Sequence, residues 1–191
     1  GRDVTRLSPE ERHVSIVYQD HALFPHLSVR DNILFGLRMR KTDAKQSRQA
    51  FSRAVELFNI AALLDRDPTT LSGGERQKVA LARALCVSPD VLLVDEPLSS
   101  LDPRTREEIE AELQRLHRAL DVTTLHVTHN FEEAVALGDR IAVIGEGEVK
   151  QVGTPEDIFR KPNSEFVAGF AMSRNIYPGE LCAADAGRRG F

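Results

Sequence analysis

From residue 91 to residue 153, short apolar runs alternate with amphipathic helical segments, and few folds accommodate such an alternation. Residues 91–94 form a continuous apolar run, which is typical of a parallel strand buried on both faces. Residues 123–127 predict a second buried strand and residues 141–144 a third, with helices between them. Strand–helix–strand alternation predicts a parallel sheet with right-handed crossovers, so the expected fold class is α/β.

The chain before residue 87 is mostly helical in pattern. Residues 14–18 are rich in β-branched and aromatic side chains and predict one short strand. Ser28, with Asp31 three positions later, predicts the capped start of a helix, and the apolar spacing over residues 42–64 predicts another. Residues 20–86 are therefore expected to be largely helical.

The segment after residue 144 predicts a hairpin and a short helix. Residues 145–148 form a turn into a pairing strand over 149–152, and Thr154 followed by Pro155 predicts a helix start. The last residues of the chain have no periodicity and are expected to fray.

Composition excludes several classes of protein. The 191 residues carry 25 Lys and Arg against 29 Asp and Glu, for a net charge of −4, so a nucleic-acid-binding surface is not expected. Cys86 and Cys182 are far apart in sequence and do not have metal-ligand spacing, which suits a reducing compartment. Since no apolar run is long enough to span a bilayer, we expect a cytoplasmic protein that reaches a membrane only through a partner.

The most specific motif is the heptad LSGGERQ at residues 71–77, directly before an apolar-periodic helix. Gly73 and Gly74 at a helix start let backbone N–H groups approach an anion, and the helix N-terminus adds partial positive charge. Ser72 adds a hydroxyl donor. The alternative is an ordinary capped helix after a Ser-Gly-Gly turn.

Two adjacent acids follow the apolar run at 91–94. The carboxyl ends of strands in nucleotide-binding sheets meet at the ligand crevice, so Asp95 and Glu96 are expected to lie there. The alternative for either acid is a helix-capping role in a loop. Gln19 likewise follows a predicted strand, where a lone glutamine is usually a loop residue.

These motifs resemble those of the ABC ATPases, and they occur in the order typical of that family from about Gly1 to about Glu180. The resemblance implies a P-loop NTPase-like (RecA-like) parallel sheet core over residues 1–19 and 87–160. It also implies an inserted α-helical signature subdomain over 20–86, and a C-terminal helix and tail over 161–191 that begins a truncated regulatory region.

The resemblance also implies roles for individual residues, with ATP and Mg²⁺ as cofactors. Asp95 and Gln19 would hold Mg²⁺, Glu96 would act as general base, and His129 would contact the γ-phosphate, so that the catalytic set is Glu96, His129 and Gln19. The residues expected to bind nucleotide are Ser72, Gly73, Gly74, Gln77 and Asp102, the last within a D-loop at 100–102.

Asp102 and His129 each have an alternative interpretation. Asp102 also fits a helix cap before Pro103. His126 and His129 could suggest a zinc site, but residues i and i+3 of a strand point to opposite faces.

The phosphate-binding motif G-x-x-x-x-G-K-[ST] does not occur in the sequence, which contains no Gly-Lys pair. In the ABC ATPases this loop lies upstream of the segment to which Gln19 and its neighbours are similar. We therefore expect an N-terminally truncated chain that lacks the first strand, the P-loop and the first helix, and that binds and hydrolyses ATP poorly alone. A degenerate family member is the alternative.

The resemblance implies partners as well. Two ATPase subunits, as a homodimer or a pair, would share composite sites, since each signature caps nucleotide held by the other subunit. A transmembrane permease would dock near Leu23 and Phe24, which we expect to be exposed, and a solute-binding protein would act indirectly. The protein would lie peripherally on the cytoplasmic face of the cell membrane, without nucleic acid.

Residues 22–37 and 151–162 resemble the branch of the family that imports oxyanions, polyamines and sugars. Residues 127–134 and 138–140 are most similar to molybdate/tungstate importer ATPases, and residues 174–180 to the entry of a regulatory β-domain. Sulfate, iron, polyamine and sugar remain alternative solutes. A DNA-repair or chromosome-type ATPase would need coiled-coil insertions and a basic channel, whereas a regulatory module without a P-loop remains open.

Overall fold

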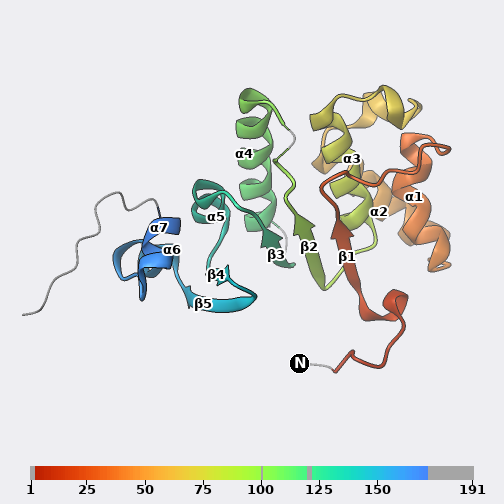
Figure 1. Ribbon diagram of the computed structural model, residues 1–191. Helices are drawn as coiled ribbons and strands as arrows, with labels where there is room; N and C mark the ends of the chain where they lie inside the picture. Colours follow the sequence, from red (N-terminus) through yellow and green to blue (C-terminus); the bar gives the residue numbers. More distant parts are fainter. Residues whose placement is uncertain (1–2, 100, 120–121, 172–191) are drawn as a thin grey trace, which may run out of the picture. The chain divides into compact units, whose positions relative to one another are not determined.

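A computed structural model describes residues 3–99, 101–119 and 122–171 (Figure 1). The chain divides into two compact units, Gly1–Leu137 and Gly138–Phe191, and each is described by itself. None of the helices in these described ranges is both long and apolar enough to cross a membrane.

The first unit contains a parallel sheet of three strands, β1 (Val14–Val17), β2 (Val91–Asp95) and β3 (Thr123–Val127), in the order β1-β2-β3. Val17 lies opposite Val94, which lies opposite His126. All three strands were predicted, and their parallel pairing confirms the α/β class. Because the strands run the same way, the residues that follow them gather at one edge.

Three helices form most of the remaining first unit before residue 87: α1 (Val29–Met39), α2 (Ala44–Leu57) and α3 (Gly73–Cys86). Two single 3₁₀ turns, Ala61–Leu63 and Pro68–Thr70, connect α2 to α3, and another, Pro9–Arg12, precedes β1. The predicted cap is present, since the Ser28 side chain accepts a hydrogen bond from the Asp31 backbone N–H. Residues 20–86 are thus largely helical, as expected.

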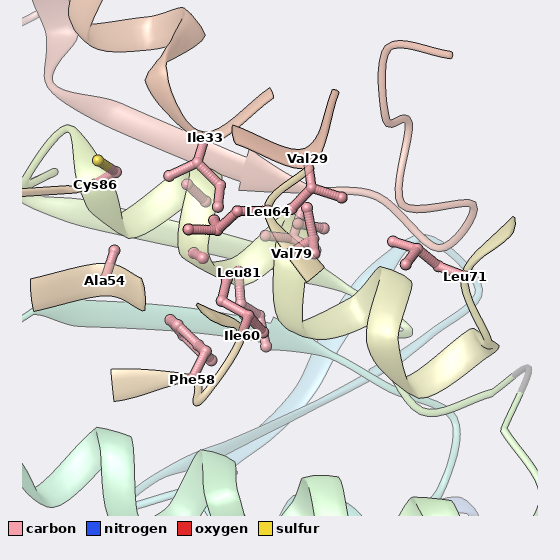
Figure 2. Close-up of a cluster of buried hydrophobic side chains, with 14 of the residues drawn as sticks. Val29, Ile33, Ala54, Phe58, Ile60, Leu64, Leu71, Val79, Leu81 and Cys86 are labelled. Atoms are coloured by element: carbon pink, nitrogen blue, oxygen red, sulfur yellow. The ribbon is translucent and has the colours of Figure 1, made fainter. Parts of the chain in front are cut away.

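Apolar side chains of these helices form the main core together with β1 and β2. Figure 2 shows side chains from α1, from α3 and from the turn after α2 pointing toward one another, with Phe58 and Ile60 beside Leu81. Ile33, Phe58 and Ile60 are completely buried. This core attaches α3 to the sheet, and α3 carries the SerGlyGly motif (Ser72, Gly73 and Gly74) at its start.

The two faces of the sheet differ in burial. On one face Val17, Leu92 and Val94 are buried, with exposed fractions of 1%, 5% and 2%. On the other face Leu125 and Val127 of β3 are 60% and 50% exposed. The prediction that residues 123–127 form a buried strand is therefore wrong. β3 lies at an edge of the sheet, and within the described residues no side chains cover its outer face.

Two further helices complete the first unit, α4 (Pro103–Ala119) and α5 (Phe131–Leu137). Asp102 caps α4 by accepting a hydrogen bond from the Thr105 backbone N–H at 3.1 Å, which confirms the capping interpretation of this residue. Lys78 of α3 forms an ion pair with the largely buried Glu112 of α4 at 3.0 Å. Ser100, in the predicted D-loop, lies outside the described residues.

The second unit begins with the antiparallel hairpin β4 (Ile141–Gly145) and β5 (Glu148–Gly153). The hairpin was predicted, and Gly147 occupies the left-handed region with φ of +78°. Thr154 begins α6 (Pro155–Arg160) through reciprocal hydrogen bonds with Asp157, and α7 (Glu165–Phe170) follows. The predicted regulatory entry at 174–180 and Cys182 lie outside the described residues.

Candidate functional site

Three side chains that follow the three parallel strands meet at the carboxyl edge of the sheet. Nε2 of Gln19 lies 3.5 Å from Oε2 of Glu96, and Nδ1 of His129 lies 3.1 Å from Oε1 of the same carboxylate. Gln19 also donates to Oγ of Ser99 at 3.1 Å. The structure thus brings together all three residues that were predicted to be catalytic.

Glu96 adopts a strained backbone conformation at this edge. Its φ of +42° lies in the left-handed region, which is uncommon for a residue other than glycine and which the fold must stabilise by other contacts. Its backbone N–H donates to the Val127 carbonyl at 2.9 Å, and its own carbonyl accepts from the Ser99 hydroxyl at 2.9 Å. These contacts turn the Glu96 side chain toward Gln19 and His129.

Asp95 ends β2 and is exposed beside this cluster. Within the described residues, no group of three or more His, Cys, Asp or Glu side chains could by itself hold a metal ion. Mg²⁺ normally binds one or two protein carboxylates and completes its shell with water and substrate phosphates. Asp95, exposed at the end of β2, therefore fits one carboxylate ligand of a magnesium ion that arrives with a nucleotide.

The loop that carries His129 is held by residues that were not among the predicted site. Glu133 of α5 accepts hydrogen bonds from Nε2 of His126 at 2.6 Å and from the Thr128 hydroxyl at 2.8 Å. The Glu133 side chain is only 8% exposed. Burial raises the pKa of Glu133, but the hydrogen bonds from His126 and Thr128, together with the charges of His126 and Arg106, lower that pKa below its ordinary value.

The SerGlyGly motif has a structural explanation within the first unit. Ser72 caps α3 through reciprocal hydrogen bonds with Glu75, at 2.7 and 3.3 Å. A Cβ atom at Gly74 would lie 2.7 Å from Cγ2 of Thr105, and one at Gly73 would lie 3.2 Å from Leu101. Both glycines therefore allow the start of α3 to approach the start of α4.

Two of the predicted nucleotide ligands are placed differently from the catalytic cluster. Gln77 is completely buried in α3, and neither atom of its amide group has a hydrogen-bond partner within the described part of the chain. A nucleotide cannot reach it in this conformation. Asp102 is exposed, and its hydrogen bonds with Thr105 lower the pKa of its carboxyl.

The segment after Gln19 is packed more tightly than predicted. Leu23 and Phe24 are half-buried rather than exposed, so the expectation of an exposed apolar pair is wrong. The reason is a guanidinium group: Arg83 of α3 lies 5.1 Å from the centroid of the Phe24 ring, and that ring also packs on Phe35. Apolar contact with α1 and cation–π contact with α3 both remove the ring from solvent.

Arg83 and Asn32 fix the backbone of this segment. Arg83 donates to the carbonyls of His21 and Ala22 at 3.0 and 2.7 Å, and both of those residues have positive φ. Asn32 is fully buried; its Oδ1 accepts from the Phe24 backbone N–H at 2.8 Å, and its Nδ2 donates to three carbonyls of residues 24–28. A polar residue on the apolar side of a predicted helix was the sequence signal for Asn32.

Comparisons with known proteins agree with the resemblance. The family model described as "ABC transporter" matches residues 1–99. Spermidine/putrescine import ATP-binding protein PotA of Trichormus variabilis is 44% identical over 186 residues, which cover 97% of this chain and 49% of that protein. Molybdate/tungstate import ATP-binding protein WtpC of Pyrococcus horikoshii is 47% identical over 179 residues, covering 94% and 52%.

A third curated relative and a solved structure are also similar to this chain. Sulfate/thiosulfate import ATP-binding protein CysA of Nocardia farcinica is 45% identical over 170 residues, covering 89% of this chain and 51% of that protein. The solved structure of cbiO1 from Clostridium perfringens, part of the ABC transporter complex cbiONQ, matches with a TM-score of 0.71 and 31% identity, covering 79% of this chain and 61% of that chain. The chain spans about half the length of the curated relatives it matches. Because the family model covers 99 of the 191 residues and the similarity to these proteins extends over most of the chain, the protein belongs to the ABC transporter family.

Proposed function

We propose that this protein is the ATP-hydrolysing subunit of an ABC importer. The observation that carries the proposal is the contact of Gln19, Glu96 and His129 at the carboxyl edge of a parallel sheet. A carboxylate, an imidazole and an amide gathered there can position and deprotonate a water molecule. Ligands of open α/β sheets bind outside this edge.

In this proposal the roles follow from the geometry around Glu96. Glu96 accepts the proton of the attacking water, while His129 and Gln19 orient the water and the phosphate group. Asp95 and Gln19 would hold Mg²⁺, which neutralises phosphate charge when it is bound. Ser72, Gly73, Gly74 and Asp102 would serve the nucleotide of a second subunit in a two-fold dimer. Gln77, which was predicted to share this role, is buried in α3 in this structure.

The relatives' names support the importer assignment and suggest where the protein works. An ATP-binding subunit of this kind would act at the cytoplasmic face of the membrane, on a transmembrane permease that a solute-binding protein supplies. We propose that the permease docks on residues 21–28, whose backbone is fixed by Arg83 and Asn32 before any partner arrives. Preorganisation of this kind lowers the entropy cost of binding.

Molybdate or tungstate is the proposed solute. The support is resemblance at residues 127–134 and 138–140 and 47% identity to the import protein of Pyrococcus horikoshii. Polyamine and sulfate or thiosulfate are the competing solutes, because relatives with those names are 44% and 45% identical. Uptake of labelled molybdate, sulfate and spermidine by cells with and without the gene separates the three.

The test of hydrolysis compares Glu96→Gln with Glu107→Gln, an exposed glutamate of α4 as matched control. Both variants are made in the protein that is translated from the start codon of the native gene. The 191-residue chain is titrated with Mg·ATP in parallel. We expect Glu96→Gln to bind Mg·ATP normally and to release phosphate about 10²–10⁴-fold more slowly, since a general base contributes about that much. Undiminished phosphate release by Glu96→Gln would overturn the proposal, and absence of Mg·ATP binding by the native form would leave a non-catalytic regulatory module.

A further inference from the structure

The short loop between β3 and α5 presents His129 to the Glu96 carboxylate. The side chain of His129 is 73% exposed, so packing alone does not fix its position. The residues on either side of it are held instead by hydrogen bonds. The Asn130 backbone N–H donates to the Thr128 hydroxyl oxygen at 3.0 Å, and that hydroxyl donates onward to Glu133 at 2.8 Å.

Glu133 is the residue on which these bonds converge. One carboxylate oxygen accepts from Nε2 of His126, which precedes the loop, and the other accepts from Thr128, which begins it. One buried carboxylate of α5 thus binds the end of β3 and the start of the loop at once. Both bonds are short, as expected for an ionised acceptor.

A buried carboxylate is costly unless it is well hydrogen-bonded. Glu133 is buried beside two donors, and the lowered pKa of its carboxyl agrees with a charged group in a satisfied site. Its neighbour Glu132 is exposed. The same residue type at adjacent positions therefore has two different environments, and only one of them connects to the loop.

Helix capping does not account for the Glu133 side chain. The cap of α5 is Asn130, whose Oδ1 accepts from the Glu133 backbone N–H at 3.1 Å and whose carbonyl accepts from the Ala134 N–H at 3.1 Å. These bonds use the backbone of Glu133 and leave its carboxylate free for His126 and Thr128. The carboxylate therefore serves the loop rather than the helix.

We propose that Glu133 is a positioning residue, which acts through Thr128 and His126 to hold His129 against Glu96. The inference rests on the proposed function, since it assigns His129 a role in ATP hydrolysis. It adds a buried anion that touches none of the reacting groups. Loss of its bonds releases the loop without removing any of the three side chains at the sheet edge.

The experiment uses the form read from the start of the native gene and four variants. Glu133→Gln keeps the shape of the side chain but removes its charge, and Thr128→Val removes the hydroxyl. Thr128→Ser restores the hydroxyl, and Glu132→Gln is the matched control. We expect Glu133→Gln and Thr128→Val to lower kcat about 10- to 100-fold, as for a misplaced catalytic group, with the KM for ATP nearly unchanged. Thr128→Ser and Glu132→Gln keep the parent kcat.

A second readout does not depend on hydrolysis. Amide hydrogen exchange of Asn130 reports whether its N–H is held by the Thr128 hydroxyl. We expect this amide to exchange at least about tenfold faster in Glu133→Gln than in Glu132→Gln, at equal thermal midpoints. Equal exchange in the two variants, or an unchanged kcat in Glu133→Gln, overturns the positioning role. His129→Ala is measured in parallel: if it hydrolyses ATP like the parent, the proposed role of His129 fails, while the exchange data still decide whether Glu133 orders the loop.

Discussion

Oε1 of Glu96 and Nδ1 of His129 are 3.1 Å apart, although these residues lie 33 positions apart in the chain. The contact exists because β2 and β3 are parallel neighbours, so the residues that follow them reach the same edge. It is reinforced by the backbone bond from Glu96 to Val127. Two side chains in such contact are expected to act as a unit rather than independently.

The first prediction concerns this unit. Glu96→Gln and His129→Ala should each lower the rate of phosphate release strongly, and the double variant should be slower than the worse single variant by less than about tenfold. The reason is that either change already removes the pair. A double-variant cycle of single-turnover rates measures this, and fully multiplicative losses would show that the two residues act separately.

Gly74 is predicted to be required for packing. An added Cβ would lie 2.7 Å from Cγ2 of Thr105, so Gly74→Ala should lower the free energy of unfolding by about 1–3 kcal/mol despite the better helix propensity of alanine. Thr105→Ser removes the opposing methyl group and should recover most of the loss. Gly169→Ala, where an added Cβ meets nothing within 4 Å, is the control. Denaturant titration measures the free energy of unfolding of each variant. If Gly74→Ala combined with Thr105→Ser is as unstable as Gly74→Ala alone, the loss has a cause other than the clash with Thr105.

Asn32 offers a test of the segment at 21–28. Asn32→Asp keeps the shape but replaces a donor to three carbonyls with a carboxylate oxygen, which should cost about 2–4 kcal/mol of stability because buried acceptors then face one another. The exposed Asn59 gives the matched control, Asn59→Asp. Thermal unfolding of both proteins measures the difference. Equal midpoints would mean that the segment does not depend on the Asn32 amide.

Cys86 is predicted to react slowly with thiol reagents. Burial raises the pKa of its thiol to about 11 from an ordinary 9.0, so at pH 8 it has about 100-fold less thiolate than an exposed cysteine. The rate of iodoacetamide labelling in a Cys182→Ser background should rise about tenfold per pH unit up to about pH 11. Protein unfolded in denaturant should label at the ordinary rate, and fast labelling of the folded protein would contradict the burial of Cys86.

Much of the fold could be predicted because local signals and the fold agree. The apolar runs at β1 and β2, the Ser28 cap, the hairpin β4–β5 and the Thr154 cap all lie where their patterns predict them. The rule that parallel strands end at one edge of the sheet predicted the position of Asp95 and Glu96, whereas the inclusion of Gln19 and His129 in the site came from the resemblance. The resemblance to ABC ATPases, confirmed by the comparisons, supplied the role of each side chain.

Other features could not be predicted because they depend on contacts between distant segments. The apolar run of β3 does not reveal which neighbours cover its faces, and Leu125 is exposed. Phe24 is half-buried because of Arg83, which lies 59 positions away in the chain. Gln77 carries a polar side chain at a position that folding buries, and no periodicity indicates whether such a residue faces a ligand or the core.

Arg83 has one more consequence. It belongs to the last turn of α3, and Ser72 caps the first, so the two residues are separated by about 16 Å of helix. Arg83 donates hydrogen bonds to the carbonyls of His21 and Ala22, so we expect a displacement of that segment to displace α3 and its N-cap Ser72 as well. A partner that displaces residues 21–22 and a phosphate bound at Ser72 would therefore act on opposite ends of the same helix.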